Sequence, residues 1–282
     1  MTAPASWEED GLNKSERLEG ILRSYGRVLV AFSGGCDSAL VLKVARETLG
    51  RGNVLAVIAK SPSLPESELA SARETACEID AELLEIETNE LENSGYAANS
   101  AHRCYFCKTE LYTRLLPIAQ ERGFPFILNG TNLDDLGDWR PGLRAAEENQ
   151  VRSPLAEAGL KKEEIRALSK RLGLSTWSKP QAACLSSRIP FGVAVTPERL
   201  KQVEEGEEIL KEAGFHQVRL RWFGKSATIE VGGDETGIFF HNAWVREKTL
   251  EGLKALGFET IDLCLEGYRS GRLNPSLTLS SS

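Results

Sequence analysis

The sequence predicts an α/β fold in which a doubly wound parallel sheet is followed by a smaller C-terminal α+β domain. Short apolar runs alternate with helical stretches over the first part of the chain, and this alternation is typical of a parallel sheet with helices on both faces. The later order of elements is helix, strand, strand, helix, strand. We therefore expect a first domain over residues 1–180, an active-site loop or linker over 181–196 and a small domain over 197–273. The serine-rich tail over 274–282 is expected to be disordered.

Apolar periodicity places the elements of the first domain. Strands are expected over 28–32, 54–59, 82–87, 126–128 and, as a short fifth strand, 174–177. Helices are expected over 11–25, over the segment with the i,i+4 pairs Leu40/Val44 and Val41/Ala45, and over 66–80, 105–120 and 163–171. Ligands of parallel sheets bind beyond the carboxyl ends of the strands, where Ser33, Lys60 and Thr131 lie.

The small domain is expected to contain two helices and three strands. The helices are expected over 197–213 and 246–256, and the strands over 217–222, 226–231 and 260–265. The stretch that precedes them, rich in Pro, Ala, Ser and Gly, fits a loop that connects two domains.

Composition disfavours several classes of protein. A net charge of −7 disfavours nucleic acid as a partner, because its phosphates attract basic surfaces. The sequence contains no apolar run approaching ~20 residues, so a membrane span is not expected. Residues 1–20 are acidic and have no apolar segment, so they do not form a signal peptide, and we expect a cytoplasmic protein. In a reducing compartment its six cysteines fit metal ligands, catalytic thiols or core positions better than disulfides.

The segment Ser33-Gly34-Gly35-Cys36-Asp37-Ser38 follows the first strand and opens a helix. Glycines there let backbone amides approach a phosphate, and the helix dipole favours the anion. Asp37 beside phosphates makes sense as a ligand of Mg²⁺. The segment is neither a Walker loop, since no Gly-Lys-Ser/Thr follows, nor a dinucleotide fingerprint, since the G-x-G-x-x-G spacing is absent. It resembles the PP-loop of the ATP-pyrophosphatase superfamily.

Cysteines mark a second candidate site. Cys104 and Cys107 are three residues apart at a helix start, where they can share a metal or form a redox pair. A metal site would need at least one further ligand from elsewhere in the chain, and Cys184 is the best candidate. Three cysteines can hold a [4Fe–4S] cluster with one open iron. Alternatively, Cys184 is a reactive thiol, because Arg188 in the same loop favours the thiolate. An incidental Cys-x-x-Cys and an inert Cys184 are the structural alternatives.

Two further groups of polar residues have both a functional and a structural interpretation. The segment 130–142 contains several acids and Arg140, which can bind metal and nucleotide together or form a solvated turn. Arg219 and Arg221 alternate on one strand, with Glu230 on the next, so they can clamp a phosphate or form a solvated strand face.

Six segments together resemble the LarE family, in the same order and over nearly the whole chain. They are 33–38, 103–108 (Arg-Cys-Tyr-Phe-Cys-Lys), 130–135, 138–142, 183–190 (Ala-Cys-Leu-Ser-Ser-Arg-Ile-Pro) and 266–271 (Glu-Gly-Tyr-Arg-Ser-Gly). The phosphate loop is shared by a superfamily with an adenine nucleotide alpha-hydrolase-like domain, whereas the segments around Cys184 and at 266–271 are much more specific.

The resemblance implies an ATP-dependent sulfurtransferase that helps to make the nickel-pincer nucleotide cofactor of lactate racemase-like enzymes. ATP adenylylates a carboxylate of a pyridinium dicarboxylate mononucleotide, and sulfur displaces AMP to give a thiocarboxylate. One family type sacrifices the sulfur of a lone cysteine, which becomes dehydroalanine. The other type binds a [4Fe–4S] cluster through three cysteines, and Cys104, Cys107 and Cys184 match these ligands.

Site residues follow from the resemblance and the strand ends together. The residues expected to bind ATP with Mg²⁺ are Ser33, Gly34, Gly35, Asp37, Ser38, Lys60, Thr131, Asp134 and Arg140. The residues expected to act in catalysis are Cys184, Asp37, Arg188 and Ser187. The residues expected around the substrate phosphate are Arg219, Arg221, Glu207 and Glu230.

The expected partners are the mononucleotide substrate, sulfide or another sulfur donor, enzymes of the cofactor pathway and, in a homo-oligomer, further copies of the chain. Neither nucleic acid nor a membrane is expected. Three other functions remain open at this point: tRNA thiolation, which uses the same phosphate loop; amide formation of the NAD synthetase kind, which does not need the cysteines; and ATP sensing without turnover.

Overall fold

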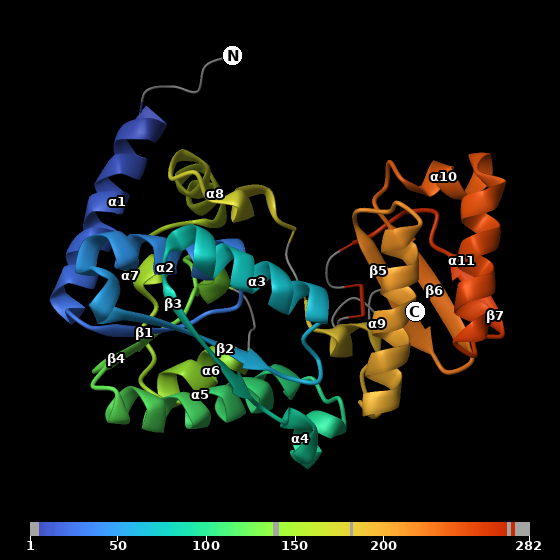
Figure 1. Ribbon diagram of the computed structural model, residues 1–282, viewed down its shortest axis with the longest axis horizontal. Coiled ribbons are helices and arrows are strands. Elements are labelled where there is room, and N and C mark those ends of the chain that lie inside the picture. Colours follow the sequence, from blue (N-terminus) through green and yellow to red (C-terminus); the bar gives the residue numbers. More distant parts are fainter. Residues whose placement is uncertain (1–5, 138–140, 181–182, 270–271, 274–282) are drawn as a thin grey trace. The chain divides into compact units, whose positions relative to one another are not determined.

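The chain divides into two compact units, each with its own sheet (Figure 1). The computed structural model describes residues 6–137, 141–180, 183–269 and 272–273. The N-terminal unit contains the described residues up to Glu90 and from Cys104 to 180, and the C-terminal unit contains 91–103 and the residues from Ala183 onward. Segment 91–103 thus belongs to the C-terminal unit, which the sequence did not indicate. The boundaries expected at 180 and 196 stay a prediction, and the expected tail lies outside the described residues.

The N-terminal unit alternates strands with helices. Its strands are β1 (Val28–Ala31), β2 (Val54–Lys60), β3 (Glu82–Glu87) and β4 (Phe126–Leu128). Its α-helices are α1 (Ser6–Tyr25), α2 (Cys36–Leu49), α3 (Glu66–Ile79), α5 (Arg103–Glu121), α6 (Pro141–Glu148), α7 (Pro154–Glu157) and α8 (Lys162–Arg171). Short 3-10 turns lie at η1 (Arg51–Asn53), η3 (Asp134–Gly137) and η4 (Ser175–Ser178), and the turn η2 (Glu90–Glu92) spans the boundary to the C-terminal unit.

All strand pairs of this sheet are parallel, in the order β3-β2-β1-β4. Side chains alternate between the faces: Val28 and Val30 belong to one apolar cluster, and Leu29 belongs to the other. Helices α1, α2, α3, α7 and α8 supply the first cluster, and α5 and α6 supply the second, so the sheet is covered on both faces (Figure 1). The predicted doubly wound parallel sheet is confirmed.

The short fifth strand predicted over 174–177 is wrong. The backbone folds there into the 3-10 turn η4, in which the amides of Trp177 and Lys179 donate to the carbonyls of Leu174 and Thr176 at 3.2 and 3.1 Å. Amides used in a local turn cannot enter a sheet ladder. Beyond β4 the described residues add one isolated parallel bridge, between Leu128 and Arg152.

The C-terminal unit is the predicted smaller α+β domain. Its elements are α4 (Ser94–Ala97), η5 (Leu185–Arg188), α9 (Pro197–Glu212), β5 (Val218–Phe223), β6 (Ser226–Val231), α10 (Thr236–His241), α11 (Ala243–Ala255) and β7 (Thr260–Leu263). The sheet order is β5-β6-β7, with an antiparallel first pair and a parallel second pair. Its core joins Leu210 of α9 and Leu253 of α11 to strand residues such as Leu220 and Ile229. Among its described residues this unit adds the short helices α4 and α10 and the turn η5 to the predicted element order.

No helix among the described residues is long and apolar enough to cross a membrane.

Tyr25 ties the end of α1 to α7 and gives the fold a pH dependence that can be measured. Its hydroxyl donates to Glu157 Oε2 at 2.6 Å and accepts from Arg152 Nε at 3.2 Å, while its ring packs on Phe126. Burial, followed by the hydrogen bond to Glu157, raises the pKa of Tyr25 from 10.0 to about 12.

We predict that Tyr25→Phe removes part of the alkaline destabilisation of the protein. The folded chain holds the phenolic proton of Tyr25 more tightly than the unfolded chain does. The contribution of this proton to the free energy of unfolding is therefore fully present below pH 10 and is lost as the pH rises from 10.0 to about 12. Denaturant unfolding at a series of pH values measures this slope. The phenylalanine variant should show a shallower fall, and equal slopes in both proteins would contradict the assignment.

Candidate active site

The phosphate-binding candidate lies at the point where the order of the parallel strands reverses. From β1 the chain continues to β2 on one side, and β4 lies on the other side of β1. The loop after β1 contains Ser33, and the loop after β4 contains Thr131. Ligands of doubly wound sheets bind in the crevice at such a switch point. The sheet therefore brings these two loops to one edge.

Two glycines are required by the geometry of these loops. Gly34 has a φ of +68°, and a Cβ atom on it would lie 2.6 Å from the Cβ of Ala72. A Cβ atom on Gly130 would lie 2.8 Å from the backbone nitrogen of Ser38. The loop after β4 thus lies directly against the first turn of α2, and larger side chains would separate them.

The two predicted serines hold the loop together. The hydroxyl of Ser38 accepts a hydrogen bond from the Ser33 amide at 3.2 Å and lies 3.0 Å from the Ser33 hydroxyl. Ser38 is buried, and its hydroxyl can also donate to the carbonyl of Gly35 at 3.2 Å. The loop is therefore preformed around its own hydroxyls, with its free amides at the start of α2.

Asp37 is paired with a lysine that the sequence analysis missed. The Nζ atom of Lys162 lies 2.7 and 2.6 Å from the two carboxylate oxygens of Asp37. Burial raises the pKa of Asp37, and the hydrogen bond and charge of Lys162 oppose that rise. The signal in the sequence was a lysine in the first turn of a helix, where the helix dipole disfavours a cation and an anionic partner is expected.

The acidic turn after β4 is ordered by its own side chains. The side-chain oxygen of Asn132 accepts from the amides of Asp134 and Asp135, at 3.0 and 3.2 Å. Asp134 accepts from the Lys162 amide at 2.8 Å, so this turn and Asp37 meet at the start of α8. Lys60, at the end of β2, lies 3.7 Å from Glu87 Oε1 and is half exposed. Arg140 lies outside the described residues.

The residues around Asp37 fit a magnesium ion bound together with ATP. Among the described residues no set of three or more His, Cys, Asp or Glu side chains is grouped to hold a metal ion by itself. Mg²⁺ usually takes one or two carboxylates and completes its shell with water and substrate phosphates. The ammonium of Lys162, which touches both oxygens of Asp37, shows that a cation is accommodated at this carboxylate.

Buried arginines hold the turn that begins at Cys184. Arg188 forms a two-point ion pair with Glu207, at 2.8 and 2.9 Å, and its remaining nitrogen donates to the carbonyls of Ala183 and Cys184. Arg221 pairs with Glu230 and donates to the Ser187 carbonyl at 3.0 Å. These two arginines and both carboxylates are buried. Through these contacts Arg188 and Arg221 position the Cys184 turn.

Arg219 has different surroundings from Arg221. It is half-buried, and its guanidinium lies 4.9 Å from the ring centre of Tyr268. Burial lowers the pKa of Arg219, and the positive charge of Arg188 lowers it further. The negative charge of Glu207 acts in the opposite direction, and the role of Arg219 in binding the substrate phosphate stays a prediction.

The candidate cysteine ligands belong to different compact units. Cys104 and Cys107 lie in the first two turns of α5 in the N-terminal unit, and Cys184 lies in the C-terminal unit. All six cysteines are thiols, and Cys104, Cys107 and Cys184 are exposed or half-buried. Cys36 is buried, and its sulfur lies 3.6 Å from the hydroxyl of Ser169. The convergence of the three candidate ligands stays a prediction.

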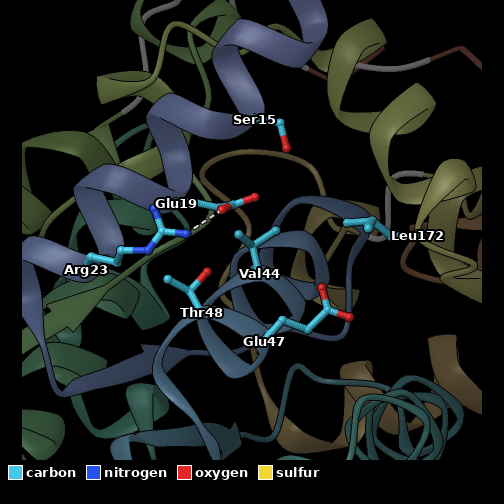
Figure 2. Close-up of a pocket in the computed structure, with 7 residues that line it drawn as sticks. All are labelled: Ser15, Glu19, Arg23, Val44, Glu47, Thr48 and Leu172. Carbon is cyan, nitrogen blue, oxygen red and sulfur yellow. Dashed lines mark hydrogen bonds and ion pairs between the residues drawn. The ribbon is translucent and has the colours of Figure 1, made fainter.

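A cavity on the N-terminal unit has no part in this site. It lies between α1 and the later turns of α2 (Figure 2) and is lined by Ser15, Glu19, Arg23, Val44, Glu47, Thr48 and Leu172. Two of its charged side chains, Glu19 and Arg23, pair with each other at 2.7 Å. None of the predicted site residues lines this pocket, so we assign it no function.

Comparison with known proteins agrees with this geometry. The family model described as NAD synthase matches residues 16–115, which include the phosphate loop. The chain is 42% identical over 266 residues to an uncharacterised protein of Synechocystis sp., covering 94% of this chain and 98% of that protein. It is 30% identical over 244 residues to an uncharacterised protein of Methanocaldococcus jannaschii, covering 86% of this chain and 91% of that protein.

A relative with a named activity covers the same span. The pyridinium-3,5-bisthiocarboxylic acid mononucleotide synthase of Lactiplantibacillus plantarum is 38% identical over 265 residues, which are 94% of this chain and 95% of that protein. Similarity at this level over both units, together with a phosphate loop at the switch point of a parallel sheet, shows that the chain belongs to the LarE family.

Proposed function

We propose that this protein is an ATP-dependent sulfurtransferase that converts carboxylates of a pyridinium dicarboxylate mononucleotide into thiocarboxylates. The observation that carries the proposal is the similarity to the L. plantarum synthase over nearly the full length of both chains. A match confined to the phosphate loop would support only the use of ATP, because many enzymes with different acceptors share that loop.

ATP activates the substrate in the first half of the proposed reaction. A substrate carboxylate attacks the α-phosphorus of ATP, the bond to the β-phosphate breaks, and pyrophosphate leaves. The backbone amides in the first turn of α2 are suited to hold the phosphate oxygens. Mg²⁺ at Asp37 would supply charge neutralisation for the leaving pyrophosphate. Lys162 lies at the same loop and can donate to those oxygens.

Sulfur replaces AMP in the second half. A sulfur nucleophile forms a C–S bond to the acyl carbon, the C–O bond to AMP breaks, and the acid product keeps the sulfur as a thiocarboxylate. No oxidant or reductant is consumed. We assign Cys184 to this step as a ligand of the centre that would supply sulfide, with its own Cβ–Sγ bond left intact, and Ser187 and Arg188 of the same turn to its orientation. Repeating both halves on the second carboxylate gives the bis-thiocarboxylate.

Cys104, Cys107 and Cys184 are proposed to be the ligands of a [4Fe–4S] cluster. The donor set fits, because all three are thiols that are not fully buried, and thiolates are the ligands such clusters require. When bound by three cysteines, the cluster supplies an open iron position that can accept sulfide from a donor. Thiols that must stay reduced fit a protein of the cytoplasm.

We predict that the protein releases AMP and pyrophosphate, and that both Asp37 and Lys162 are needed for this. Asp37→Ala removes the carboxylate expected to hold Mg²⁺, and Lys162→Ala removes a cation at the phosphate loop, so each should slow AMP release at least about 100-fold. Lys161→Ala, at the neighbouring lysine, is the matched control and should retain activity. The measurement is nucleotide analysis after adding ATP, Mg²⁺ and the mononucleotide. Release of ADP and orthophosphate would refute the assignment, and pyrophosphate release dependent on tRNA or ammonia would favour the alternative enzymes.

We predict different consequences for the two arginines of β5. Arg219→Ala should raise KM for the mononucleotide about 10-fold or more, because a charge-assisted contact to phosphate is lost. Arg221→Ala should mainly destabilise the C-terminal unit, since it leaves the carbonyl of Ser187 and part of Glu230 without their donor. Steady-state kinetics and thermal unfolding separate the two effects. An unchanged KM in Arg219→Ala would place the phosphate elsewhere.

We predict that protein prepared without oxygen contains iron and acid-labile sulfide, and that Cys104→Ala, Cys107→Ala or Cys184→Ala each removes most of both. Absorption spectra with iron and sulfide analysis are the measurement, and Cys77→Ala is the control. With a sulfide source the intact protein should transfer more than one sulfur per chain, and Cys184 should keep its mass. Dehydroalanine at Cys184 in cluster-loaded protein would refute this route and support the sacrificial one.

A further inference from the structure

Three buried arginines of the C-terminal unit donate to main-chain carbonyls of the turn that carries Cys184. Arg103 is one of them, and it is 6% exposed. The contacts are Arg188 to Ala183 and Cys184 (2.6 and 3.1 Å), Arg103 to Ser186 (2.9 Å) and Arg221 to Ser187 (3.0 Å). Most carbonyls of this short segment are therefore held by a guanidinium.

Arg103 differs from the other two in its charge balance. Arg188 is paired with Glu207 and Arg221 with Glu230, whereas Arg103 has no carboxylate partner among the described residues. Its remaining contacts are the side-chain oxygen of Asn99 and the ring of Phe191, 5.3 Å away. The Nε atom is buried and has no acceptor within the described part of the chain. A buried cation without a counter-charge indicates that an anion belongs beside it.

The position of Arg103 in the chain links two of the candidate cysteines. Its peptide bond leads directly to Cys104, and its hydrogen bond reaches Ser186, two residues after Cys184. Arg103 and Ser186 belong to the same compact unit, so this contact is internal to it.

The segment that ends at Arg103 holds the same turn at two more points. The hydroxyl of Tyr96 lies 2.6 Å from the hydroxyl of Ser186, and both residues are fully buried. The side-chain amide of Asn99 donates to the carbonyls of Ile189 and Pro190, at 3.1 and 2.8 Å. Residues 91–103 therefore form a platform for the Cys184 turn, which explains why they belong to the C-terminal unit.

We propose that Arg103 is a positioning residue for the sulfur step: it fixes the Cys184 turn to the segment that leads into Cys104 and places an uncompensated positive charge beside the anionic sulfur. This inference rests on the proposed function. Thiolate, sulfide and thiocarboxylate are all anions, which a fixed buried cation stabilises. Displacement of AMP also requires the sulfur to lie about 3–3.5 Å from the acyl carbon. If the turn were loose, water would hydrolyse the adenylate before the sulfur could attack it.

The first test compares two products in one reaction. Arg103→Gln is assayed beside Arg114→Gln, which changes an exposed arginine of the same helix that pairs with Glu110. We expect AMP release within about 2-fold of the unmodified protein, while thiocarboxylate formed per AMP falls about 10-fold or more, because the adenylate is hydrolysed instead. Arg114→Gln should change neither quantity. A parallel fall of both quantities in Arg103→Gln, or no fall in the ratio, would overturn the proposal.

The second test needs no turnover. In metal-free reduced protein, alkylation of Cys184 by iodoacetamide is followed by peptide mass spectrometry, with exposed Cys77 as the internal reference. In Arg103→Gln we expect the rate of alkylation of Cys184, relative to that of Cys77, to change about 10-fold or more. In Arg103→Lys, which keeps the charge but loses the planar guanidinium, we expect an intermediate change in this rate. An unchanged rate would overturn the proposal.

If Arg103→Gln does not fold, the alkylation of Cys184 is measured in Tyr96→Phe instead. This substitution removes only the hydroxyl that touches Ser186 and should alter the Cys184 rate in the same direction. A rate equal to that of the unmodified protein would count against the platform. If the unmodified protein releases no AMP with a pyridinium mononucleotide, the proposed function fails, and the alkylation results still decide the role of Arg103.

Discussion

The edge of the N-terminal sheet depends on the ion pair between Asp37 and Lys162. A carboxylate buried among other acids would lose its charge, and the raised pKa of Asp37 shows that burial acts in this direction. Lys162 opposes this loss by contacting both oxygens. Because Asp37 lies in the first turn of α2 and Lys162 in the first turn of α8, the pair also fixes two helices that follow different parts of the sheet.

In the proposed reaction that pair would also prepare the site for ATP. Bringing a triphosphate to Asp37 alone would place like charges together, whereas the lysine already supplies a cation at the same loop. The amide of Lys162 holds Asp134 as well, so the acidic turn after β4 is held by the same residue. Positive charge is thus fixed before the substrate arrives and needs little rearrangement when charge develops on pyrophosphate.

The fold could be predicted because its signals are local. Buried apolar runs such as 54–59 and the glycines of the phosphate loop place the strands and the turn, and parallel strands then dictate which loops share an edge. The turn at 174–177 was predicted as a strand because its apolar residues resemble one, while its amides bond within the turn. Lys162 and segment 91–103 were missed because their partners, Asp37 and Ser186, are distant in sequence. Strand alternation placed Arg219 and Arg221 on one face of β5, but it indicated neither the ion pair of Arg221 with Glu230 nor the contact of Arg221 with Ser187.

The buried arginines of the C-terminal unit need a reason other than stability, because burying an ion pair costs about as much as the pair returns. Their shared feature is that each donates to a carbonyl in or next to a short 3-10 turn. The carbonyls of Cys184 and Ser186 also accept amides of the turn, whereas those of Ala183 and Ser187 are held by guanidiniums. At an exposed turn water would occupy these carbonyls. Here Leu185 and Ser186 are fully buried, and guanidiniums take the place of water. In the proposed reaction water would destroy the acyl adenylate, and a Cys184 turn whose carbonyls are held by guanidiniums instead of water would favour attack by sulfur over hydrolysis.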